Sequence, residues 1–399
     1  MAVPKLRFPE FTDDWEQRKL GDLYTERNER GNGSLQILSV SIHTGVSDGE
    51  LDVDNLGKFV RRSEDKSTYK HVHSGDLIFN MMRAWQGAIG VAKTEGMISP
   101  AYISAIPSED IYPPFMNYLL RRKDVINQIN NLSYGVTDFR KRLYWNSFVQ
   151  VNCKLPSVEE QRNITDVFEK IDHLITLHQR KLDDIKLLKK SMLQKMFPAE
   201  GRDVPEVRFP GFTAAWEQRK LGDECNQLTT FINPQNEPNR LFAEYSMPAY
   251  DLNKNPDYVL GSTMNSARKV VDRPCLLINK LNVRKQRIWC IEDPEKNAVC
   301  SAEFIPVCSE GIDLRFLSYV VSGNAFTSYL EDCSSGSSNS QKRVTPDTIM
   351  NAEICIPSRA EQQKIGAYFR DLDHFITLHQ RKCDDLQKLK KALLQQMFC

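Results

Sequence analysis

The sequence predicts an α+β fold: a tandem duplication of two mixed α/β domains, separated by two long helices that form an antiparallel coiled coil. Three observations predict it. Two segments recur at a constant offset, one of them has the heptad spacing of a long helix, and both halves show strand and helix patterns in the same order. With 399 residues, 41% of them hydrophobic and 26% charged, the chain is long enough for two or three folded domains.

The internal repeat is the strongest of these observations. Residues 7–22, RFPEFTDDWEQRKLGD, recur at 208–223 with 13 of 16 positions identical. Residues 160–197 recur at 361–398 with 22 of 38 positions identical. Both pairs of segments are 201 residues apart, so the whole chain is a duplication.

The parts between the repeated segments, residues 24–155 and 225–356, diverge strongly. Repeated segments that flank diverged ones are typical of two domains that have the same function on different targets. The alternative is that these parts drifted under weaker constraint.

Each diverged part has the pattern of a mixed α/β domain. The first domain, residues 1–158, has strand patterns followed by a helical segment at 115–130 and a last strand. Its predicted strands are 35–42, 76–81, 88–92, 98–106 and 149–155. In the second domain, residues 216–358, the helical segment is 314–330 and the predicted strands are 270–279, 287–291, 302–308 and 352–356.

Long helices are predicted at residues 159–197 and 359–399, with a linker at 198–215. Apolar residues there recur at alternating steps of three and four, which is typical of a coiled coil. The stripe contains Ile164, Phe168, Ile171, Ile175, His178, Leu182 and Ile185 in the first helix, and Ile365, Phe369, Leu372, Ile376, His379 and Leu386 in the second. One stripe per helix predicts that the helices pack on each other, and antiparallel packing would place the domains at opposite ends. We interpret the two histidines as polar residues that set the register.

Each helix begins with a Pro-Ser-x-x-Glu capping box, at Pro156 and Pro357. There the serine oxygen can accept a free backbone N–H while the glutamate side chain reaches back to the start of the helix. The first helix is expected to stop at Phe197, before Pro198.

Polar and basic side chains gather in predicted loops at matching places in the two domains. Arg and Lys can pair with guanine and Asn or Gln with adenine in the major groove, whereas Lys also holds phosphates. For any single residue an ordinary solvated loop position is an equally good interpretation. The candidate DNA-binding residues are Asn80, Arg83, Gln86, Thr137, Arg140, Lys141, Arg142, Lys280, Asn282, Arg284, Lys285, Arg287, Asn339, Gln341, Lys342 and Arg343.

The composition limits partners and cofactors. The formal charge of +1 is low for a protein that binds DNA without partners, so either local basic patches or partner subunits must supply much of the contact with DNA.

The cysteines and histidines do not predict a metal site. No two of the ten cysteines form a C-x2-4-C pair and no histidine cluster stands beside them. Without an apolar run long enough for a signal peptide or a membrane span, we expect a cytoplasmic protein.

Catalytic motifs are missing from the sequence. The nearest match to an [Asp/Asn]-Pro-Pro-[aromatic] motif has Tyr112 in place of the acceptor residue, and no P-loop occurs. We therefore predict a chain that is not an enzyme and carries no cofactor.

The repeated W-E-Q-R-K-L-G-D segments, the P-S-x-x-E-Q helix starts and the heptad helices resemble those of the specificity subunits of type I restriction–modification systems. The resemblance covers essentially the whole chain. It implies two target-recognition domains that read the halves of a bipartite, asymmetric sequence in double-stranded DNA, with the helices setting the spacer. It also implies two methylation subunits that use S-adenosylmethionine, and motor–nuclease subunits that use ATP and magnesium.

Two other functions stay open at this stage. A self-contained methyltransferase–nuclease would need the motifs that are missing. A scaffold or regulator would use the coiled coil for protein partners without reading DNA. The target bases, the spacer length and the assignment of domains to half-sites do not follow from the sequence.

Overall fold

The computed structural model describes residues 3–31, 34–43, 45–47, 68–135, 141–199, 201–336 and 341–398. They form two compact units. Unit 1 consists of Met1–His178 together with Lys382–Cys399, and unit 2 of Gln179–Arg381. Each long helix therefore contributes one part to unit 1 and another part to unit 2.

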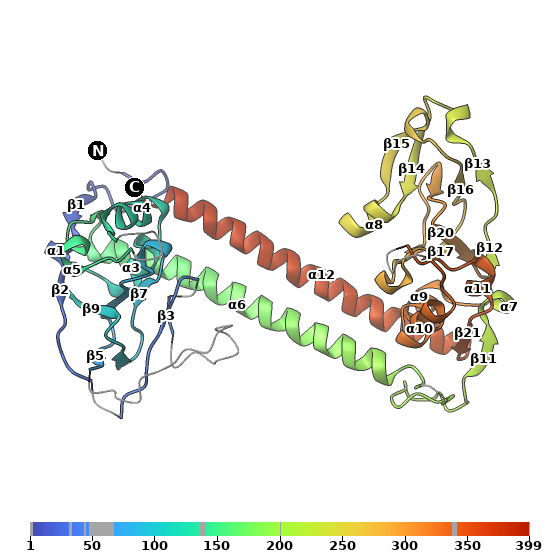
Figure 1. The fold of residues 1–399 in the computed structure, drawn as a ribbon, viewed down its shortest axis with the longest axis horizontal. Helices are drawn as coiled ribbons and strands as arrows, with labels where there is room; N and C mark the ends of the chain where they lie inside the picture. Colours follow the sequence, from blue (N-terminus) through green and yellow to red (C-terminus); the bar gives the residue numbers. More distant parts are fainter. Residues whose placement is uncertain are drawn as a thin grey trace. The chain divides into compact units, whose positions relative to one another are not determined.

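Unit 1 is built around an antiparallel four-stranded sheet, in the order β2-β9-β6-β7. Three two-stranded pairs, β1-β10, β3-β4 and β5-β8, accompany it. The elements, in chain order, are β1 (Glu16–Lys19), α1 (Leu20–Leu23), β2 (Tyr24–Glu26), β3 (Val40–Ser41), β4 (Gly45–Val46), β5 (Lys70–Val72), β6 (Leu77–Asn80), η1 (Ala84–Gln86), β7 (Ile89–Val91), β8 (Gly96–Ile98), β9 (Tyr102–Pro107), α3 (Pro113–Leu119), α4 (Lys123–Leu132), α5 (Trp145–Phe148), β10 (Asn152–Leu155) and α6 (Val158–Lys195) (Figure 1).

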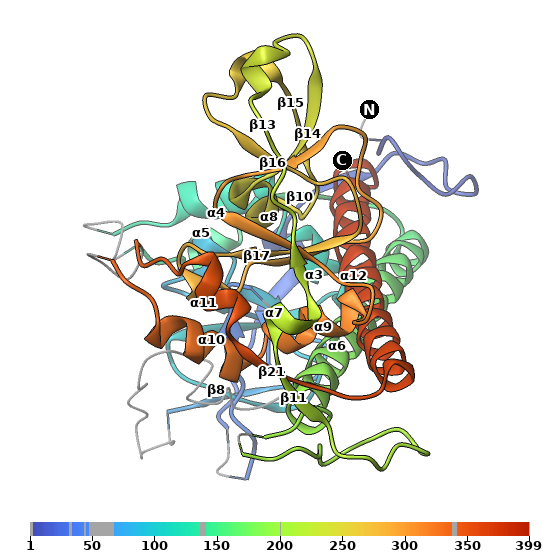
Figure 2. The ribbon, with the colours of Figure 1, turned by 90° about the vertical axis from the view of Figure 1, so that its right-hand side faces the viewer.

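Unit 2 repeats this plan and adds a second sheet. Its four-stranded sheet β12-β20-β17-β18 corresponds to the sheet of unit 1, and the additional five-stranded sheet has the order β13-β16-β19-β14-β15. Figure 2 shows the additional sheet lying away from α9, α10 and α11. The elements are β11 (Glu217–Lys220), α7 (Leu221–Glu224), β12 (Asn226–Gln227), β13 (Phe231–Ile232), η3 (Pro234–Asn236), β14 (Leu241–Tyr245), α8 (Met247–Leu252), β15 (Asp257–Leu260), η4 (Gly261–Thr263), β16 (Arg268–Val270), β17 (Cys275–Asn279), η5 (Val283–Lys285), β18 (Ile288–Ile291), β19 (Ala298–Cys300), β20 (Phe304–Cys308), α9 (Leu314–Val321), α10 (Asn324–Asp332), α11 (Pro346–Met350), β21 (Glu353–Ile356) and α12 (Arg359–Gln396).

Several predicted elements are divided in the structure. The helical segment 115–130 is interrupted between α3 and α4, where Arg122 has an extended backbone with ψ 148°. The segment 314–330 is likewise divided into α9 and α10, because Gly323 is extended and leaves the helix. The predicted strand 270–279 becomes β16 and β17, because the Asp272-Arg273-Pro274 turn lies within it.

Other predicted strands are shorter than expected. Of residues 35–42 only Val40 and Ser41 form a strand, and residues 98–106 divide into β8 and β9 around Pro100. The repeated Glu-Gln-Arg-Lys segments were not predicted as strands at all. They form β1 and β11, which pair antiparallel with β10 and β21, the strands that lead into the long helices.

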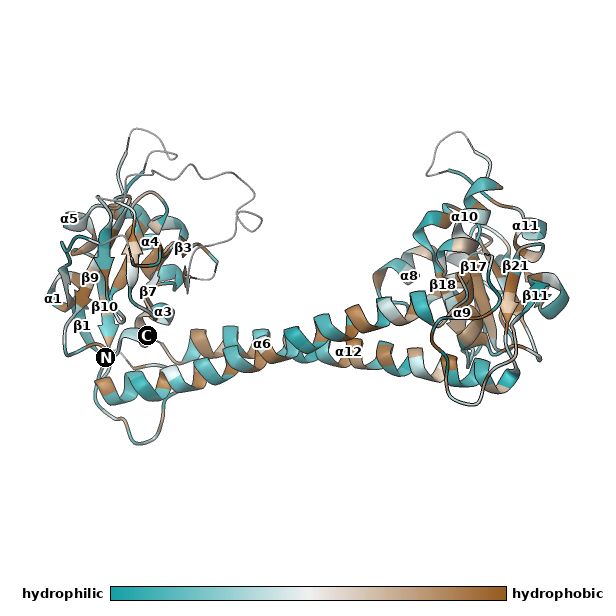
Figure 3. Ribbon diagram, turned by 90° about the horizontal axis from the view of Figure 1, so that it is seen from below, coloured by the Kyte–Doolittle hydropathy of each residue, from teal (hydrophilic) through white to brown (hydrophobic). Residues whose placement is uncertain are grey.

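The two long helices pack antiparallel within each unit, and the predicted α+β fold with paired helices is confirmed. In unit 1, Lys390 Nζ lies 2.5 Å from Asp172 Oδ1. In unit 2, Lys189 Nζ lies 2.5 Å from Asp373 Oδ1. The predicted stripe residues are all buried or half-buried, including His178 and His379. Figure 3 shows the apolar positions along α6 and α12.

The glutamate of the predicted capping box has a different role from the expected one. Ser157 Oγ accepts the backbone N–H of Glu160 at 3.3 Å, as expected. The buried Glu160 carboxylate, however, accepts two hydrogen bonds of 2.8 Å from Arg7. Glu361 is held in the same way by Arg208. These bidentate ion pairs join the N-terminal segment of each repeat to the start of its own long helix.

The end of each long helix closes the core of the unit built by the other repeat. Met397 and Phe398, directly after α12, belong to the core of unit 1, where Phe398 packs against Trp15 and Phe115. Met196 belongs to the core of unit 2, and Phe197 packs against Trp216 and Phe316 there. Each core is therefore completed by the end of the long helix that belongs to the other repeat.

The equivalent substitutions Phe398→Ala and Phe197→Ala should each destabilise a different unit, because each removes a large aromatic side chain that packs in a core. We expect about 3–5 kcal/mol for the buried Phe398 and less for the half-buried Phe197. Hydrogen exchange should accelerate in β6 for Phe398→Ala and in β17 for Phe197→Ala. Leu389→Ala, at an exposed position of α12, is the control and should leave both strands protected. Equal acceleration of both strands by either variant would contradict this assignment.

Candidate nucleic-acid interface

Two segments lie side by side at one end of the four-stranded sheet in each unit. The strand-end loop follows β6 (residues 80–87) or β17 (residues 279–287). The hairpin segment is named for the antiparallel bridges Tyr134–Arg142 and Ser335–Arg343, and its described residues are 134–135 and 141–142 in unit 1 and 335–336 and 341–343 in unit 2. In unit 1, Leu143 N–H donates to Met81 O at 2.8 Å. In unit 2, Asn282 N–H donates to Lys342 O at 2.9 Å and Val344 N–H to Lys280 O at 3.1 Å. These contacts bring together the described candidate residues of both segments.

An asparagine at the end of the central strand starts each strand-end loop. Asn80 Oδ1 accepts the Met82 N–H at 2.9 Å, and Asn279 Oδ1 accepts the Leu281 N–H at 3.1 Å. Both asparagines are buried, with 8% and 3% exposure. A side chain that accepts a backbone N–H two residues later fixes a tight turn. The geometry therefore gives Asn80 a turn-forming role.

The strand-end loop of unit 2 has unusual backbone conformations. Asn282 and Gln286, on either side of η5, have φ angles of 53° and 45°. Asparagine adopts this left-handed region more readily than glutamine. Gln286 is held there by contacts, since its Nε2 donates to Thr327 Oγ1 at 2.9 Å and its carbonyl accepts from the Tyr250 hydroxyl at 3.4 Å.

In unit 1 four of the remaining candidates can be placed. Arg83 and Gln86 are exposed in the strand-end loop. Lys141 is half-buried and Arg142 exposed in the hairpin segment, where Arg142 and Tyr134 exchange two backbone hydrogen bonds. The other two candidates, Thr137 and Arg140, lie outside the described residues.

In unit 2 the exposed candidates are Arg284, Lys285, Gln341 and Arg343. The half-buried candidates are Lys280, Asn282 and Lys342. Asn339 lies outside the described residues.

Two exposed arginines of unit 2 have carboxylate partners. Arg284 Nε lies 3.0 Å from Glu331, and Arg343 Nη2 lies 2.9 Å from Glu303. Both guanidinium side chains keep 53% of their surface exposed. Ion pairs at such exposed positions contribute little free energy. A phosphate or a base edge can therefore replace the carboxylate at small cost.

Arg287 differs from the other described basic candidates because it is buried, with 7% exposure. Its guanidinium donates two hydrogen bonds, of 2.8 and 2.7 Å, to the Asp251 carboxylate. This contact raises the pKa of Arg287 and lowers that of Asp251. Arg287 joins the strand-end loop to α8, so we leave it out of the proposed contact surface.

Two aromatic side chains at the ends of the hairpin region of unit 1 were not among the predicted site residues. Tyr134 and Tyr144 stack with ring centroids 4.9 Å apart, and Tyr134 is 60% exposed. Exposed aromatic rings are a recurrent feature of recognition surfaces. The available signal was a pair of tyrosines flanking a run of basic residues.

The arrangement of two similar α/β units, each with two divergent loops on a repeated frame, defines a two-module recognition protein. Comparison with known proteins narrows this class. No protein-family model matches the chain. The type I restriction enzyme MjaVIII specificity subunit of Methanocaldococcus jannaschii is 21% identical, over 98% of this chain and 92% of its own length. The putative type I restriction enzyme MjaX specificity subunit of the same organism is 23% identical, over 98% and 94%.

The fold agrees with that of a solved structure. The S subunit of a type I restriction–modification system from M. genitalium matches with a TM-score of 0.60 and 12% identity, over 100% of this chain and 99% of that one. The predicted resemblance to type I specificity subunits is therefore confirmed over the full length of the chain. Within the described ranges, every helix is too short or too polar to cross a bilayer.

Proposed function

We propose that the chain is the specificity subunit of a type I restriction–modification complex and reads a bipartite, asymmetric target in double-stranded DNA. The observation that carries this proposal is the repeated loop pair. Both units hold a strand-end loop against a hairpin segment by backbone hydrogen bonds, while the side chains in the loops differ. One frame with two sets of exposed polar side chains suits two different half-sites.

The proposal assigns a separate function to each segment of the chain. Residues 1–158 and 216–358 act as the two target-recognition domains. The helices at 159–197 and 359–399 act as the spacer, and residues 198–215 connect the halves. Base edges are read by the exposed arginines and glutamines of the strand-end loops and hairpin segments, and the lysines hold phosphates.

The long helices offer a matching apolar surface in each unit for a protein partner. The exposed residues of unit 1 are Leu174, Leu177 and Leu389, and the residues one repeat away in unit 2 are Phe375, Leu378 and Leu188. An exposed leucine alone needs no explanation, but the same positions exposed in both repeats favour a contact surface used twice. We propose that each surface binds one methylation subunit.

Catalysis resides in the partners under this proposal. The methylation subunits use S-adenosylmethionine to modify adenine, and the motor–nuclease subunits use ATP and magnesium. The near-neutral charge of +1 is consistent with partners that supply part of the DNA contact. The complex works on DNA, so we place the chain in the cytoplasm.

The experiment that tests this function is co-expression with a methylation subunit, followed by sequencing of methyladenine in the host DNA. We expect one split motif with a fixed gap. Exchange of residues 24–155 for those of a relative should then change one half of the motif, because unit 2 is untouched. A change in both halves would contradict independent recognition, and a stable complex without a new methylated motif would contradict DNA reading itself.

Two substitutions in unit 2 should separate base reading from phosphate contact. Arg284→Ala should lower affinity for the correct site by about 1–3 kcal/mol and relax specificity at one base pair. Lys342→Ala should weaken binding to all sequences about equally and reduce the salt dependence. Binding is measured by fluorescence anisotropy on matched and single-substituted duplexes.

The control for these variants is Arg273→Ala. Arg273 is equally charged and exposed, but it lies before β17, at the opposite end of that strand from the loop. It should leave affinity and specificity unchanged. Equal loss on every duplex for Arg284→Ala would assign that residue to the backbone instead.

Leu389→Asp should remove one of the two methylation subunits from the complex, because a carboxylate at a buried apolar contact is strongly unfavourable. Native mass spectrometry should then give one methylation subunit per chain instead of two. Gln387→Asp is the matched control, since it adds the same charge two residues away, on another face of α12. Two methylation subunits bound to Leu389→Asp would show that the surface is not the docking site.

A further inference from the structure

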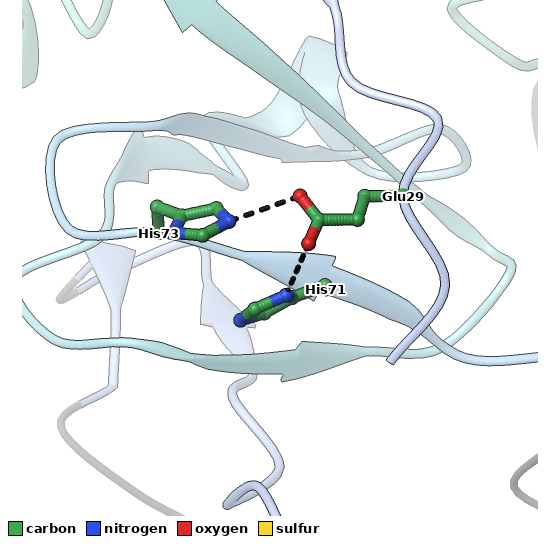
Figure 4. A group of neighbouring side chains, drawn as sticks. All are labelled: Glu29, His71 and His73. Carbon is green, nitrogen blue, oxygen red and sulfur yellow. Dashed lines mark hydrogen bonds and ion pairs between the residues drawn. The ribbon is translucent and has the colours of Figure 1, made fainter. Parts of the chain in front are cut away.

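Unit 1 contains a cluster of histidine and carboxylate side chains that the proposed function does not use. Glu29 follows β2, and its backbone segment pairs with β5, since His71 N–H donates to Glu29 O at 2.9 Å. His71 lies in β5 and His73 directly after it, so both imidazoles lie on the same face of the strand. Figure 4 shows both rings directed at the Glu29 carboxylate.

The contacts within the cluster are short and involve specific atoms. His71 Nδ1 lies 2.8 Å from Glu29 Oε1, and His73 Nε2 lies 3.0 Å from Glu29 Oε2. The other nitrogen of His71, Nε2, lies 2.7 Å from Glu95 Oε1. One possible ligand atom from each of Glu29, His71 and His73 lies within 4.8 Å of the other two.

We propose that Glu29, His71 and His73 bind one divalent transition-metal ion of the zinc type. Two imidazole nitrogens and one carboxylate oxygen form a ligand set that prefers zinc and its neighbours to magnesium or calcium, which favour oxygen ligands only. Three protein ligands leave the fourth position of a tetrahedral site for water.

The distances suit such an ion after a small adjustment. Metal–ligand bonds of about 2.0–2.2 Å place tetrahedral ligand atoms roughly 3.3–3.6 Å apart. The present contacts of 2.8 and 3.0 Å join the two histidines to different oxygens of Glu29, so an ion among them needs these contacts to lengthen by about half an ångström and the carboxylate to turn one oxygen toward both nitrogens. The Glu29 and His73 side chains are 45% and 42% exposed, so both can move by this amount.

Glu95 supports the proposal because it occupies the position of a second-shell carboxylate. A histidine that binds a metal usually donates its other N–H to a carboxylate, which fixes the tautomer. With Glu95 accepting from Nε2–H, the His71 Nδ1 lone pair is directed at Glu29 and the ion. His71 itself is well enclosed, with a side-chain exposure of 12%.

A positive charge beside the cluster has its own partner. Arg27 Nη1 donates to Glu29 Oε2 at 3.1 Å, while its Nη2 donates to the buried Asp76 at 3.0 Å. Asp76 offsets the charge of Arg27, so the guanidinium orients the Glu29 carboxylate without cancelling its charge.

Protons should compete with the ion. The hydrogen bonds from His73 and His71 lower the pKa of Glu29 to about 2, so this carboxylate is ionised throughout the neutral range. Burial lowers the pKa of His71, but the hydrogen bonds with Glu29 and Glu95 outweigh burial and raise it overall. An imidazole must give up its proton before it binds a metal ion, so protons and the ion compete for this site.

The test is titration of the purified full-length chain with ZnCl2 by calorimetry, together with the visible absorption of the Co²⁺ form. We expect one ion per chain, since no histidine occurs between residues 225 and 356 of the second half. His73→Asn should abolish saturable binding and the Co²⁺ bands. Glu95→Gln keeps all three ligands and should weaken binding by about 10–100-fold.

His43→Asn is the matched control, because His43 is an exposed histidine of unit 1 outside the cluster. It should bind zinc like the unchanged chain, and excess Mg²⁺ should not displace zinc from either. Circular dichroism of each variant without metal verifies folding. The same zinc titration for His73→Asn and the unchanged chain, or no saturable binding by the unchanged chain, would overturn the proposal and leave an ion-pair network only.

Discussion

The rest of the structure depends on the insertion of each helix end into the core formed by the other repeat. Phe398 packs among Trp15, Phe115 and Phe168 in unit 1, and Phe197 packs among Trp216, Phe316 and Phe369 in unit 2. Each long helix starts in the core of its own repeat and its end completes the core of the other repeat. The two helices must therefore run in opposite directions. The antiparallel pairing of α6 and α12 therefore follows from the cores as well as from the helix stripe. It also means that neither repeat alone contains all of the residues of one core.

Polar contacts also join the two long helices beside each apolar core. The Asp172 carboxylate accepts from the Tyr118 hydroxyl at 3.0 Å and from Lys390, so it joins α3, α6 and α12 within unit 1. Asp373 joins Tyr319 and Lys189 in the same way in unit 2. Burial raises the pKa of both tyrosines and the adjacent aspartates add to the effect, so each hydroxyl stays protonated and can donate. Because both partners of each aspartate are repeated in the sequence, these contacts fix the same helix register in both units.

The parts of the fold that the sequence predicted are those with a strong apolar period. Ile164, Phe168 and Leu182 repeat at heptad spacing, and the structure buries all three. The strand β1 has no such period, since Glu16, Gln17, Arg18 and Lys19 are all polar and its hydrogen bonds to β10 are the only reason it is a strand. The capping glutamate was misassigned for a related reason. Spacing within a helix start cannot reveal that Arg7, about 150 residues earlier, provides a stronger partner for Glu160.

Prediction of the candidate interface from the sequence meets the same difficulty. The type of a side chain does not show whether it is available to a ligand or supports the fold. Arg284 and Arg287 are three residues apart in one loop, yet one is exposed and the other is buried against Asp251. Likewise the cysteine spacing gives no metal signal, and the group of Glu29, His71 and His73 joins residues from two separate segments. In each of these cases the role of a side chain depends on a partner that is distant in the sequence.

The side chains that support the loop conformation are different from the exposed side chains of the loops. Asn80 and Asn279 fix the turns with their side chains, and backbone hydrogen bonds hold each strand-end loop to its hairpin segment. Backbone contacts do not depend on which side chains the loop carries, so exposed positions such as Arg83 and Arg284 can change without loss of the frame. The divergence of the two halves is then what a shared scaffold permits: the cores and helices are constrained by each other, and the loop surfaces are constrained only by what they bind.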